Sequence, residues 1–350
     1  MNRNPTKKPT LKDVASKLGV STATVSNAFN RPDQLSAALK TKILEQCQEL
    51  GYTGPSLTAR SLRTGKTGVI GVLLADNLSY NFTDPVATEF LAGISEVLDA
   101  QHVNMLLLPS NSENYQATQA ETIPDSFIVY GKPADTGVLE RLQRQGKPLV
   151  TVDFDLAKTP SVSINNEESA YKVASHVLTS PQQKPLILGL RLEPSNALSF
   201  SHFNNLYNAE ESISRRRLDG YKRAMAEVGI ELATQHVWQI HHLEHEAMKA
   251  VLRGALTAPE PVDVLLCMSD RIALAAMDAA RELGLKVPEQ LKIVGFDGIA
   301  QAESYGLTTV RQPLIEKGRT AANIALGQLP YQSVQLKEEI IIRQSSSLEP

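Results

Sequence analysis

The sequence predicts a small all-α head followed by an α/β body built from two doubly wound parallel sheets. Between residues 10 and 51, apolar side chains recur at helical spacing, whereas from Val69 onward short apolar runs alternate with amphipathic segments. The balance of basic and acidic residues changes at the same place. Residues 1–66 hold 11 Lys and Arg against 4 Asp and Glu, a balance of +7, and the remaining chain holds 24 against 34, or −10. At 350 residues, the chain is long enough for several hydrophobic cores.

The head is expected to contain three helices. Thr10 is a suitable N-cap for the first, with an acidic residue three positions later as in a capping box. Gly19 allows a sharp turn, Ser21 caps the second helix, and the third helix starts at Ser36 and ends at Leu50-Gly51. The apolar positions expected to pack the three helices together are Leu11, Val14, Ala15, Leu18, Val25, Ala28, Leu39, Ile43, Leu44 and Cys47.

A helix, a tight turn, a short polar helix and a supporting helix make a helix-turn-helix arrangement. Short side chains on the second helix allow close approach to base edges and phosphates in a major groove. A structural three-helix cap or a solvated basic face would be the plainer interpretations, but the charge asymmetry favours a polyanionic partner. The side chains expected to read DNA are Thr22, Ala23, Thr24, Ser26 and Asn27.

Three stretches of the head have a specific order and spacing: TLKDVASKLGVSTATVSNAFN, then Ser36 with KTKI, then ELGY ending at Tyr52. They resemble the lactose-repressor (LacI/GalR) family of bacterial transcription regulators, and the resemblance continues through almost the whole chain. It implies a DNA-binding domain over residues 1–53. Asn27 replaces an Arg that many members have, so contact with a base and contact with phosphate alone both stay open. The resemblance implies that Thr10, Ser21, Thr22, Ala23, Thr24, Ser26, Asn27, Asn30, Ser36 and Tyr52 contact DNA.

Residues 54–67 form a basic segment between the head and the first apolar run. Pro55 and Ser56 can start a short helix, and Gly65 and Gly68 would end it. A semi-flexible linker is one interpretation. The family resemblance implies a hinge helix that folds on DNA, pairs with its twin in a homodimer and presses a leucine into the minor groove. The residues implied in this role are Ala59, Arg60 and Leu62.

Residues 68–350 are expected to form two lobes. The family resemblance implies a periplasmic-binding-protein-like body whose chain crosses between the lobes three times. Lobe one covers roughly 68–164 with a later segment near 313–328, and lobe two covers roughly 165–312 with the C-terminal segment. The predicted buried strands are VIGVLLAD, VNMLLLP, SFIVYG, PLVTVDF, PLILGLRL, HVWQIHH, VDVLLCMSD and LKIVGFDG.

Ligands of such sheets bind beyond the carboxyl ends of the strands, here between the lobes. Carboxylates, amides and an arginine beside a flat aromatic ring suit a polyhydroxylated ligand, because they pair with hydroxyl groups while the ring stacks on the apolar sugar face. The resemblance places Arg217 at the family's ligand arginine. Strand-end capping is the alternative, above all for Asp270. The residues expected to bind the effector are Asp76, Ser79, Tyr80, Phe82, Asp84, Asp153, Arg217, Asp270, Asp297 and Gln312.

Two other classes of protein fit the sequence less well. A sugar-transport protein would need export and no helix-turn-helix, and a sugar-processing enzyme would need a catalytic constellation, which the sequence does not offer. His241 and His245 share a helical spacing without a third metal ligand, so we expect no metal and no cofactor. No apolar run is long enough for a membrane span, and no signal-peptide core follows the basic N-terminus.

The sequence therefore predicts a ligand-responsive, sequence-specific DNA-binding transcription regulator in the cytoplasm. By family resemblance it is a repressor of carbohydrate-use genes and a homodimer that binds double-stranded operator DNA, with a small-molecule effector, a sugar, between its lobes. Among the departures from the family, residues 192–214 are longer than the usual segment, which predicts a loop that closes differently over the cleft.

Overall fold

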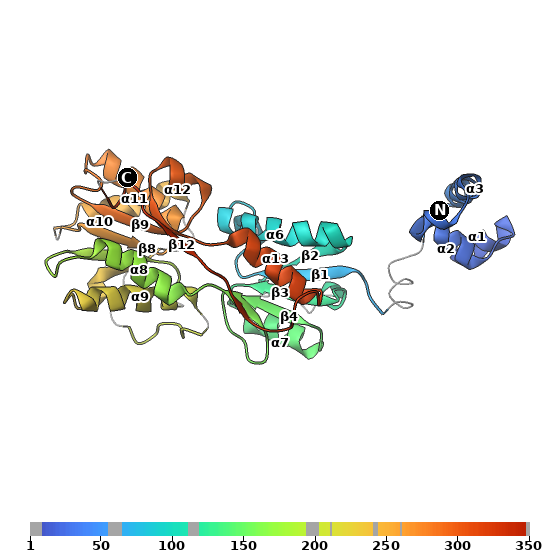
Figure 1. Ribbon diagram of the computed structural model, residues 1–350, viewed down its shortest axis with the longest axis horizontal. Coiled ribbons are helices and arrows are strands. Elements are labelled where there is room, and N and C mark those ends of the chain that lie inside the picture. Colours follow the sequence, from blue (N-terminus) through green and yellow to red (C-terminus); the bar gives the residue numbers. More distant parts are fainter. Residues whose placement is uncertain are drawn as a thin grey trace, which may run out of the picture. The chain divides into compact units, whose positions relative to one another are not determined.

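The computed structural model of the protein divides into two compact units, Met1–Gly68 and Val69–Pro350. It describes residues 9–54, 65–110, 119–193, 203–210, 212–240, 244–259 and 261–347 (Figure 1). The unit boundary lies directly before the first apolar run. No helix within these ranges is long and apolar enough to cross a membrane.

The described part of the first unit contains three α-helices and one 3-10 turn. Thr10, Ser21 and Ser36 cap the α-helices as predicted, because each side-chain oxygen accepts a hydrogen bond from the backbone N–H three residues later. Gly19 and Gly51 end α1 and α3 with φ angles of +66° and +69°, which a glycine adopts without strain. The elements are α1 (Leu11–Leu18), α2 (Thr22–Asn30), η1 (Pro32–Gln34) and α3 (Ala37–Leu50).

The core of the first unit is the predicted apolar face. Its buried members come from all three α-helices, and Leu11, Leu18 and Leu39 pack around them. Leu44, which was expected in this core, is only half-buried and lies outside the cluster. The buried residues are Val14, Ala15, Val25, Ala28, Ile43 and Cys47.

Lobe one of the second unit is a six-stranded sheet in the order β11-β5-β4-β3-β1-β2, with every neighbouring pair parallel. Its strands are β1 (Val69–Leu74), β2 (Asn104–Leu108), β3 (Ser126–Tyr130), β4 (Leu149–Val152), β5 (Ser161–Ser163) and β11 (Val334–Gln335). Its helices are α5 (Leu78–Asn81), α6 (Pro85–Gln101), η2 (Gln119–Thr122), α7 (Thr136–Arg144) and α13 (Leu314–Ala325).

Lobe two repeats the plan, with the strand order β12-β10-β9-β8-β6-β7 and only β10 and β12 antiparallel. Its strands are β6 (Pro185–Gly189), β7 (Val237–Gln239), β8 (Val264–Cys267), β9 (Lys292–Asp297), β10 (Thr308–Arg311) and β12 (Glu339–Ile341). Its helices are α8 (Asn166–Val177), α9 (Ile213–Glu227), η3 (Thr234–His236), α10 (His245–Leu256), α11 (Asp270–Glu282) and α12 (Ala300–Ser304).

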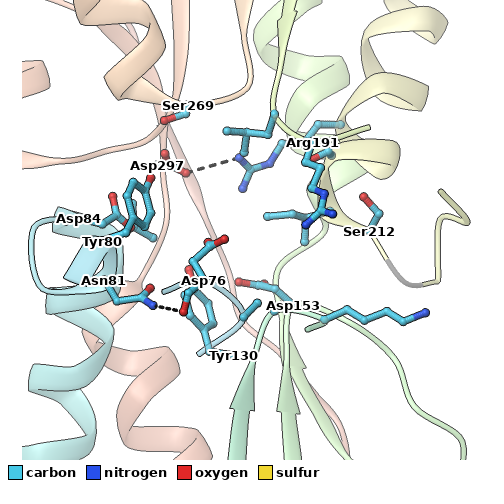
Figure 2. A pocket seen from close by; sticks show the side chains of 18 of the residues that line it. Asp76, Tyr80, Asn81, Asp84, Tyr130, Asp153, Arg191, Ser212, Ser269 and Asp297 are labelled. Atoms are coloured by element: carbon cyan, nitrogen blue, oxygen red, sulfur yellow. Dashed lines mark hydrogen bonds and ion pairs between the residues drawn. The ribbon is translucent and has the colours of Figure 1, made fainter. Parts of the chain in front are cut away.

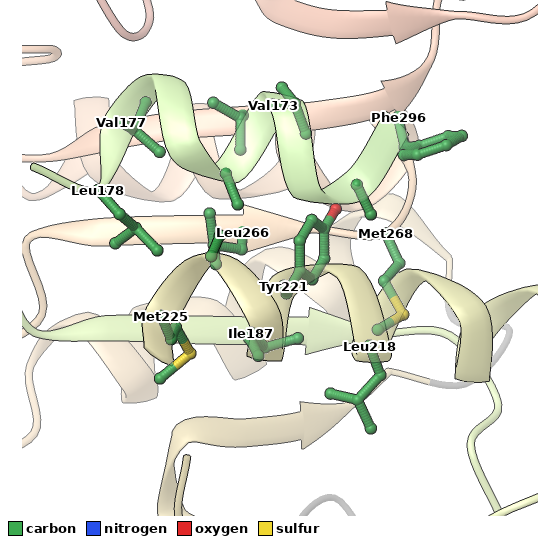
Figure 3. Packing of buried hydrophobic residues seen from close by; sticks show 14 of the residues in the cluster. Val173, Val177, Leu178, Ile187, Leu218, Tyr221, Met225, Leu266, Met268 and Phe296 are labelled. Carbon is green, nitrogen blue, oxygen red and sulfur yellow. The ribbon is translucent and has the colours of Figure 1, made fainter. Parts of the chain in front are cut away.

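Helices cover both faces of each sheet, so both lobes are doubly wound. In lobe one, α6 and α13 pack on one face and α7 packs on the other. In lobe two, α8 and α9 cover one face, and α10 and α11 cover the opposite face. Figure 3 shows the layer beneath α8 and α9, in which the buried Tyr221 also donates a hydrogen bond of 3.1 Å from its hydroxyl to the Cys267 carbonyl. The predicted fold class is confirmed.

The chain passes between the lobes three times in the second unit. It crosses after β5 into α8, after β10 into α13, and between β11 and β12. Lobe one therefore takes α13 and β11 from the far end of the chain, where Figure 1 shows α13 beside α6. The carboxyl ends of the parallel strands of both lobes border the region between them, which is where a ligand site is expected.

Candidate functional site

The second helix of the first unit presents small polar side chains to solvent. Thr22 and Ala23 are exposed at its start, while Val25 and Ala28 face the core. Nothing else in the described first unit covers this end of the helix, so its first turn is open to an incoming polymer.

The other predicted DNA-contact residues of the head have internal roles as well. Thr24 is hydrogen-bonded through its hydroxyl to the Ser21 hydroxyl at 2.8 Å, and Asn30 donates from Nδ2 to the Ser26 carbonyl at 3.0 Å. Asn27 donates from Nδ2 to Gln34 Oε1 at 3.2 Å, which fixes its amide on the helix surface.

Tyr52 packs edge-on against Phe29, with 6.0 Å between ring centroids, and is half-buried. Its ring therefore closes the helical core of the head. Ala59, Arg60 and Leu62, the predicted hinge contacts, lie outside the described residues.

A cavity of about 530 Å³ lies between the lobes of the second unit. Strand ends and helix starts from both lobes form its walls, and Figure 2 shows the polar side chains that face it. Seven of the ten predicted effector residues line this cavity: Asp76, Tyr80, Asp84, Asp153, Arg217, Asp297 and Gln312.

Arg217 is the most buried charged group of the cavity, with 1% of its surface exposed. Its Nε donates to Asn166 Oδ1 at 3.0 Å, its Nη1 donates to the Met268 carbonyl, and the same nitrogen lies 3.5 Å from Asp297 Oδ1. The guanidinium also lies flat on the Phe296 ring, 3.6 Å from the ring centroid. These contacts fix its plane before any ligand arrives.

A chain of buried polar contacts joins the two lobes behind the cavity. Asp297 Oδ1 accepts from Gln312 Nε2 at 2.8 Å, and Gln312 Oε1 accepts from Lys317 Nζ at 2.6 Å. Lys317, on α13 of lobe one, is fully buried and pairs with both carboxylate oxygens of Asp153 at 2.7 Å. Arg217 and Asp153 are thus the two ends of one network.

The backbone at two of these carboxylates is unusual. Asp153 has a φ angle of +64° and Asp297 one of +124°, in a region that residues with a side chain rarely adopt. Such conformations persist only where the surroundings enforce them, and they concentrate at ligand sites. Both strained residues face the same cavity.

Burial is the main cause of the pKa shifts in the polar network that joins the lobes. It raises the pKa of Asp297 to about 7, although the nearby Arg217 opposes the shift. Burial likewise lowers the pKa of Lys317, against the influence of Asp153. The charged groups of the cavity have therefore lost favourable hydration by water. Hydrogen bonds from a ligand would offset part of this loss.

The wall from lobe one combines aromatic and acidic groups. Tyr130 stacks on Phe90, with 4.6 Å between ring centroids. Asp84 caps α6 and lies 3.8 Å from Nη1 of Arg271, a residue of lobe two whose guanidinium is 5.1 Å from the Tyr80 ring centroid. This wall can stack a sugar ring and accept hydroxyl hydrogen bonds.

Three of the predicted effector residues do not line the cavity. Ser79 on the one-turn helix α5 and Phe82 directly after it are exposed to solvent, and Phe82 is 61% exposed. Asp270 lies beneath the site. Its carboxylate accepts from the N–H groups of Gly298 and Ile299 at 2.7 and 3.0 Å, and from the Thr309 hydroxyl at 2.6 Å.

Sequence reasoning missed several groups that shape the cavity. Lys317 has a detectable signal, because it occupies a position of the α13 apolar stripe at helical spacing from Leu314 and Ala321. Asn166, which orients Arg217, has only its position at a helix start. The other missed polar groups in the cavity wall are Asn81, Tyr130, Lys132, Thr136, Arg191, Tyr207, Ser212, Ser214, Ser269 and Arg271.

The described part of the long segment before Arg217 reaches across to lobe one. The N–H of Asp155 donates to the Glu210 carbonyl at 2.9 Å, and Arg216 pairs with the Asp155 carboxylate at 2.5 Å. Tyr207 from the same segment lines the cavity. Residues 194–202 and 211 lie outside the described residues, so the predicted loop closure stays a prediction.

No group of three or more possible metal-ligating side chains occurs in the part of the chain that the structure describes. The imidazole Nε2 of His245 is 2.8 Å from Asp278 Oδ2, and His241 lies outside the described residues.

Comparison with known families gives two matches. Residues 10–54 match the family described as bacterial regulatory proteins, lacI family, and residues 198–346 match the periplasmic binding protein-like domain. An HTH-type transcriptional regulator of Mycobacterium tuberculosis is 34% identical over 332 residues, 93% of this chain and 92% of its own length. The HTH-type transcriptional repressor CytR of Escherichia coli is 31% identical over 360 residues, 97% of each chain.

Solved structures have the same architecture. A LacI-family transcriptional regulator from Corynebacterium glutamicum is 27% identical, with a TM-score of 0.69 over 97% of this chain and all of its own. The transcriptional regulator CelR in complex with cellobiose is 22% identical, with a TM-score of 0.64 over 96% and 99%. A regulator from Enterococcus faecium with bound ribose is 21% identical, with a TM-score of 0.63 over 80% and 98%.

Proposed function

The chain belongs to the lacI family of bacterial regulatory proteins, and from this premise we propose that it is a repressor whose operator affinity changes when a sugar-like effector binds between its lobes. Family membership makes it a transcriptional regulator with a ligand-binding domain. The relatives are regulators rather than enzymes. The proposal adds the sign of regulation, the class of effector and the residues that contact each partner.

The observation that carries the proposal is the cavity between the lobes. It presents the Arg217 guanidinium, fixed carboxylates and the Gln312 amide beside the Tyr80 and Tyr130 rings, a set suited to a polyhydroxylated ligand. The cellobiose and ribose in two structural neighbours support a sugar. The proposed effector contacts are Asp76, Tyr80, Asp84, Asp153, Arg217, Asp297 and Gln312.

The DNA-facing part of the proposal rests on the head. We propose that residues 1–53 read double-stranded operator DNA through α2, that residues 54–67 act as the hinge, and that residues 68–350 sense the effector. A homodimer would present two reading helices to a two-fold symmetric operator. Such a protein acts where the chromosome is, in the cytoplasm.

A ligand screen followed by DNA binding tests the sensing role. We expect a mono- or disaccharide to raise the melting temperature and to change operator affinity. Arg217→Ala should weaken that ligand by about 1–3 kcal/mol because it leaves ligand hydroxyls without a partner. Operator affinity in the absence of ligand should hold. Unchanged ligand affinity in Arg217→Ala would show that the cleft contacts are misassigned.

Exchange of the α2 surface tests the reading role. Operators selected from random duplex DNA should differ between the wild-type protein and a variant with other residues at Thr22 and Ala23, while affinity for unrelated DNA stays similar. An equal loss of affinity for every sequence would assign these two residues to phosphate contact instead.

A further inference from the structure

The N-terminus of α9 opens into the cavity, where Ser212, Ile213 and Ser214 form part of the wall. A helix leaves its first N–H groups without intrahelical acceptors. Here the Arg215 N–H is satisfied by the Ser212 hydroxyl at 3.3 Å. In the part of the chain that the structure describes, the N–H groups of Ile213 and Ser214 have no acceptor. The 15-residue helix therefore directs two donors and its positive dipole end at the cavity.

A second observation points to a ligand at this place. Ser214 is only 5% exposed and lines the cavity, and among the described residues none is hydrogen-bonded to its hydroxyl. It lies three residues before Arg217, so both side chains share the face of α9 that borders the cavity. The Ser214 hydroxyl is therefore available to form a hydrogen bond with a ligand in the cavity.

A cationic side chain, Arg191, lies at the same end of the cavity as the start of α9. Arg191 follows β6 and lines the cavity, and it has no acidic partner in the described ranges. Its neighbour Leu192 accepts at its carbonyl from the Tyr207 N–H at 2.9 Å, and Tyr207 in turn accepts from Arg215 Nη1 at 3.3 Å. One residue thus ties the Arg191 loop to the first turn of α9.

The two sides of the cavity differ in charge. Figure 2 shows Arg191 and Ser212 on one side, Asp84 and Asp297 on the opposite side, and Asp76 and Asp153 between them. The carboxylates on that opposite side already face cations, Arg271 at 3.8 Å and Arg217 at 3.5 Å. An anionic group of a ligand is therefore favoured at the side of Arg191 and Ser212. Hydroxyl groups of the ligand are favoured at the side of Asp84 and Asp297.

We propose that the effector carries a phosphate monoester that binds at the N-terminus of α9, with its polyhydroxylated part toward Asp84 and Asp297. This assignment rests on the proposed function and narrows its ligand class. Two backbone N–H groups, the Ser214 hydroxyl and the Arg191 guanidinium supply donors from several directions, which matches three phosphate oxygens better than a planar carboxylate.

The test uses the full-length protein and matched ligands. Glucose, fructose and myo-inositol are each titrated beside their monophosphates, with gluconate as the carboxylate arm and inorganic phosphate as the minimal probe at constant ionic strength. Arg191→Gln and Ser214→Ala remove one donor each. Arg253→Gln, which changes an exposed arginine of α10 away from the cavity, is the matched control.

We expect inorganic phosphate to raise the melting temperature, and at least one monophosphate to bind about tenfold or more tightly than its parent sugar. Both donor variants should lose most of that preference, and Arg253→Gln should keep it. The proposal is overturned if inorganic phosphate has no effect, if the variants respond as the wild type does, or if gluconate binds more tightly than the monophosphates.

Operator binding measured in parallel separates this inference from the wider proposal. A neutral sugar that binds the cleft and changes operator affinity, without any preference for its phosphate, would leave the regulator proposal standing and remove the phosphate site. Ligand binding without any change in operator affinity would instead remove the proposed coupling.

Discussion

Asp297 illustrates how single residues set the chemistry of the cleft. Its carboxylate is buried, accepts from Gln312 and lies beside Arg217, yet desolvation still raises its pKa to about 7. An ordinary aspartate has a pKa of about 4. The folded protein therefore holds a proton here that the unfolded chain has already released across the interval between these values. Stability from this group is fully present below about pH 4 and is lost as the pH rises through about 7.

Asp297→Asn should remove this pH dependence. We expect the melting temperature of the wild type to fall, relative to that of the variant, as the pH rises from about 5 to about 8, because only the wild type has a buried carboxyl to ionise at this position. Thermal unfolding over this range measures the difference. Asp99→Asn, at an exposed position of α6, serves as control. Parallel curves for the wild type and Asp297→Asn would contradict the raised pKa.

Sequence patterns locate strand ends but not the direction of each side chain. Asp270 and Asp297 both close a predicted strand, yet Asp297 faces the cavity while Asp270 turns beneath it to hold the Gly298 and Ile299 N–H groups. That difference depends on tertiary hydrogen bonds between segments far apart in the chain. Lys317 was missed for a related reason, because a lysine in an amphipathic helix is usually solvated.

At the level of elements, the eight long apolar runs all form the predicted strands, since strands buried on both faces have continuous apolar sequences. Four strands were not predicted: β5, β10, β11 and β12, of which β11 and β12 are sheet edges. Each has only two to four residues, with polar side chains among them, so no periodicity can reveal them. Their pairing is set by the chain crossings between the lobes.

Close helix packing depends on a few glycines. At Gly220 of α9, an added Cβ would lie 2.2 Å from the Glu167 carbonyl oxygen and 2.8 Å from the Tyr171 nitrogen, both backbone atoms of α8 or its start. At Gly254 of α10, an added Cβ would meet nothing within 4 Å. The two positions therefore form a matched pair in one lobe.

Gly220→Ala should separate α8 from α9 and lower stability by about 1–3 kcal/mol, the usual cost of overpacking. Gly254→Ala should raise stability by up to about 1 kcal/mol, because alanine favours an exposed helix over glycine. Denaturant unfolding of both variants gives the comparison. Similar shifts in both would mean that α8 and α9 adjust to the extra methyl group.

At the level of the whole molecule, buried polar groups join the lobes. Lys317 of lobe one contacts Asp153 and Gln312, and Gln312 contacts Asp297 of lobe two.

Lys317→Met should lower the free energy of unfolding by about 3–5 kcal/mol, because it leaves the buried Asp153 carboxylate without its cation. Adding Asp153→Asn should recover part of this loss. Unfolding of the single and double variants measures the coupling, and Arg144→Met, in an exposed pair with Glu140, should change little.

If the double variant were no more stable than Lys317→Met alone, the lysine would stabilise the fold by packing rather than by charge. Effector affinity supplies a second measurement. Loss of the Lys317 contact frees the Gln312 side chain to reorient. The affinity for the effector should therefore fall when this polar link between the lobes is lost.

The positive charge of the head is distributed unevenly. Residues 9–54, which form its helices, hold 5 Lys and Arg against 4 Asp and Glu, whereas residues 1–8 and 55–66 each hold three cations and no acidic residue. Removal of residues 1–8 should therefore reduce the slope of log affinity against log salt by up to about 2.7. DNA binding across a salt series tests this. Lys158, Lys184 and Lys286, all exposed on the body, provide a charge-matched control when replaced by Gln.

The interleaved lobes also determine the order in which the protein can be finished on the ribosome. All core contacts of the head lie within residues 11–52, so the head can fold as soon as it emerges. Lobe one must wait for α13 and β11, which are made only after nearly all of lobe two. Translation that stops anywhere between residues 68 and 313 therefore releases a chain with a complete head and no complete lobe. Such a product would be able to bind DNA but unable to bind the effector.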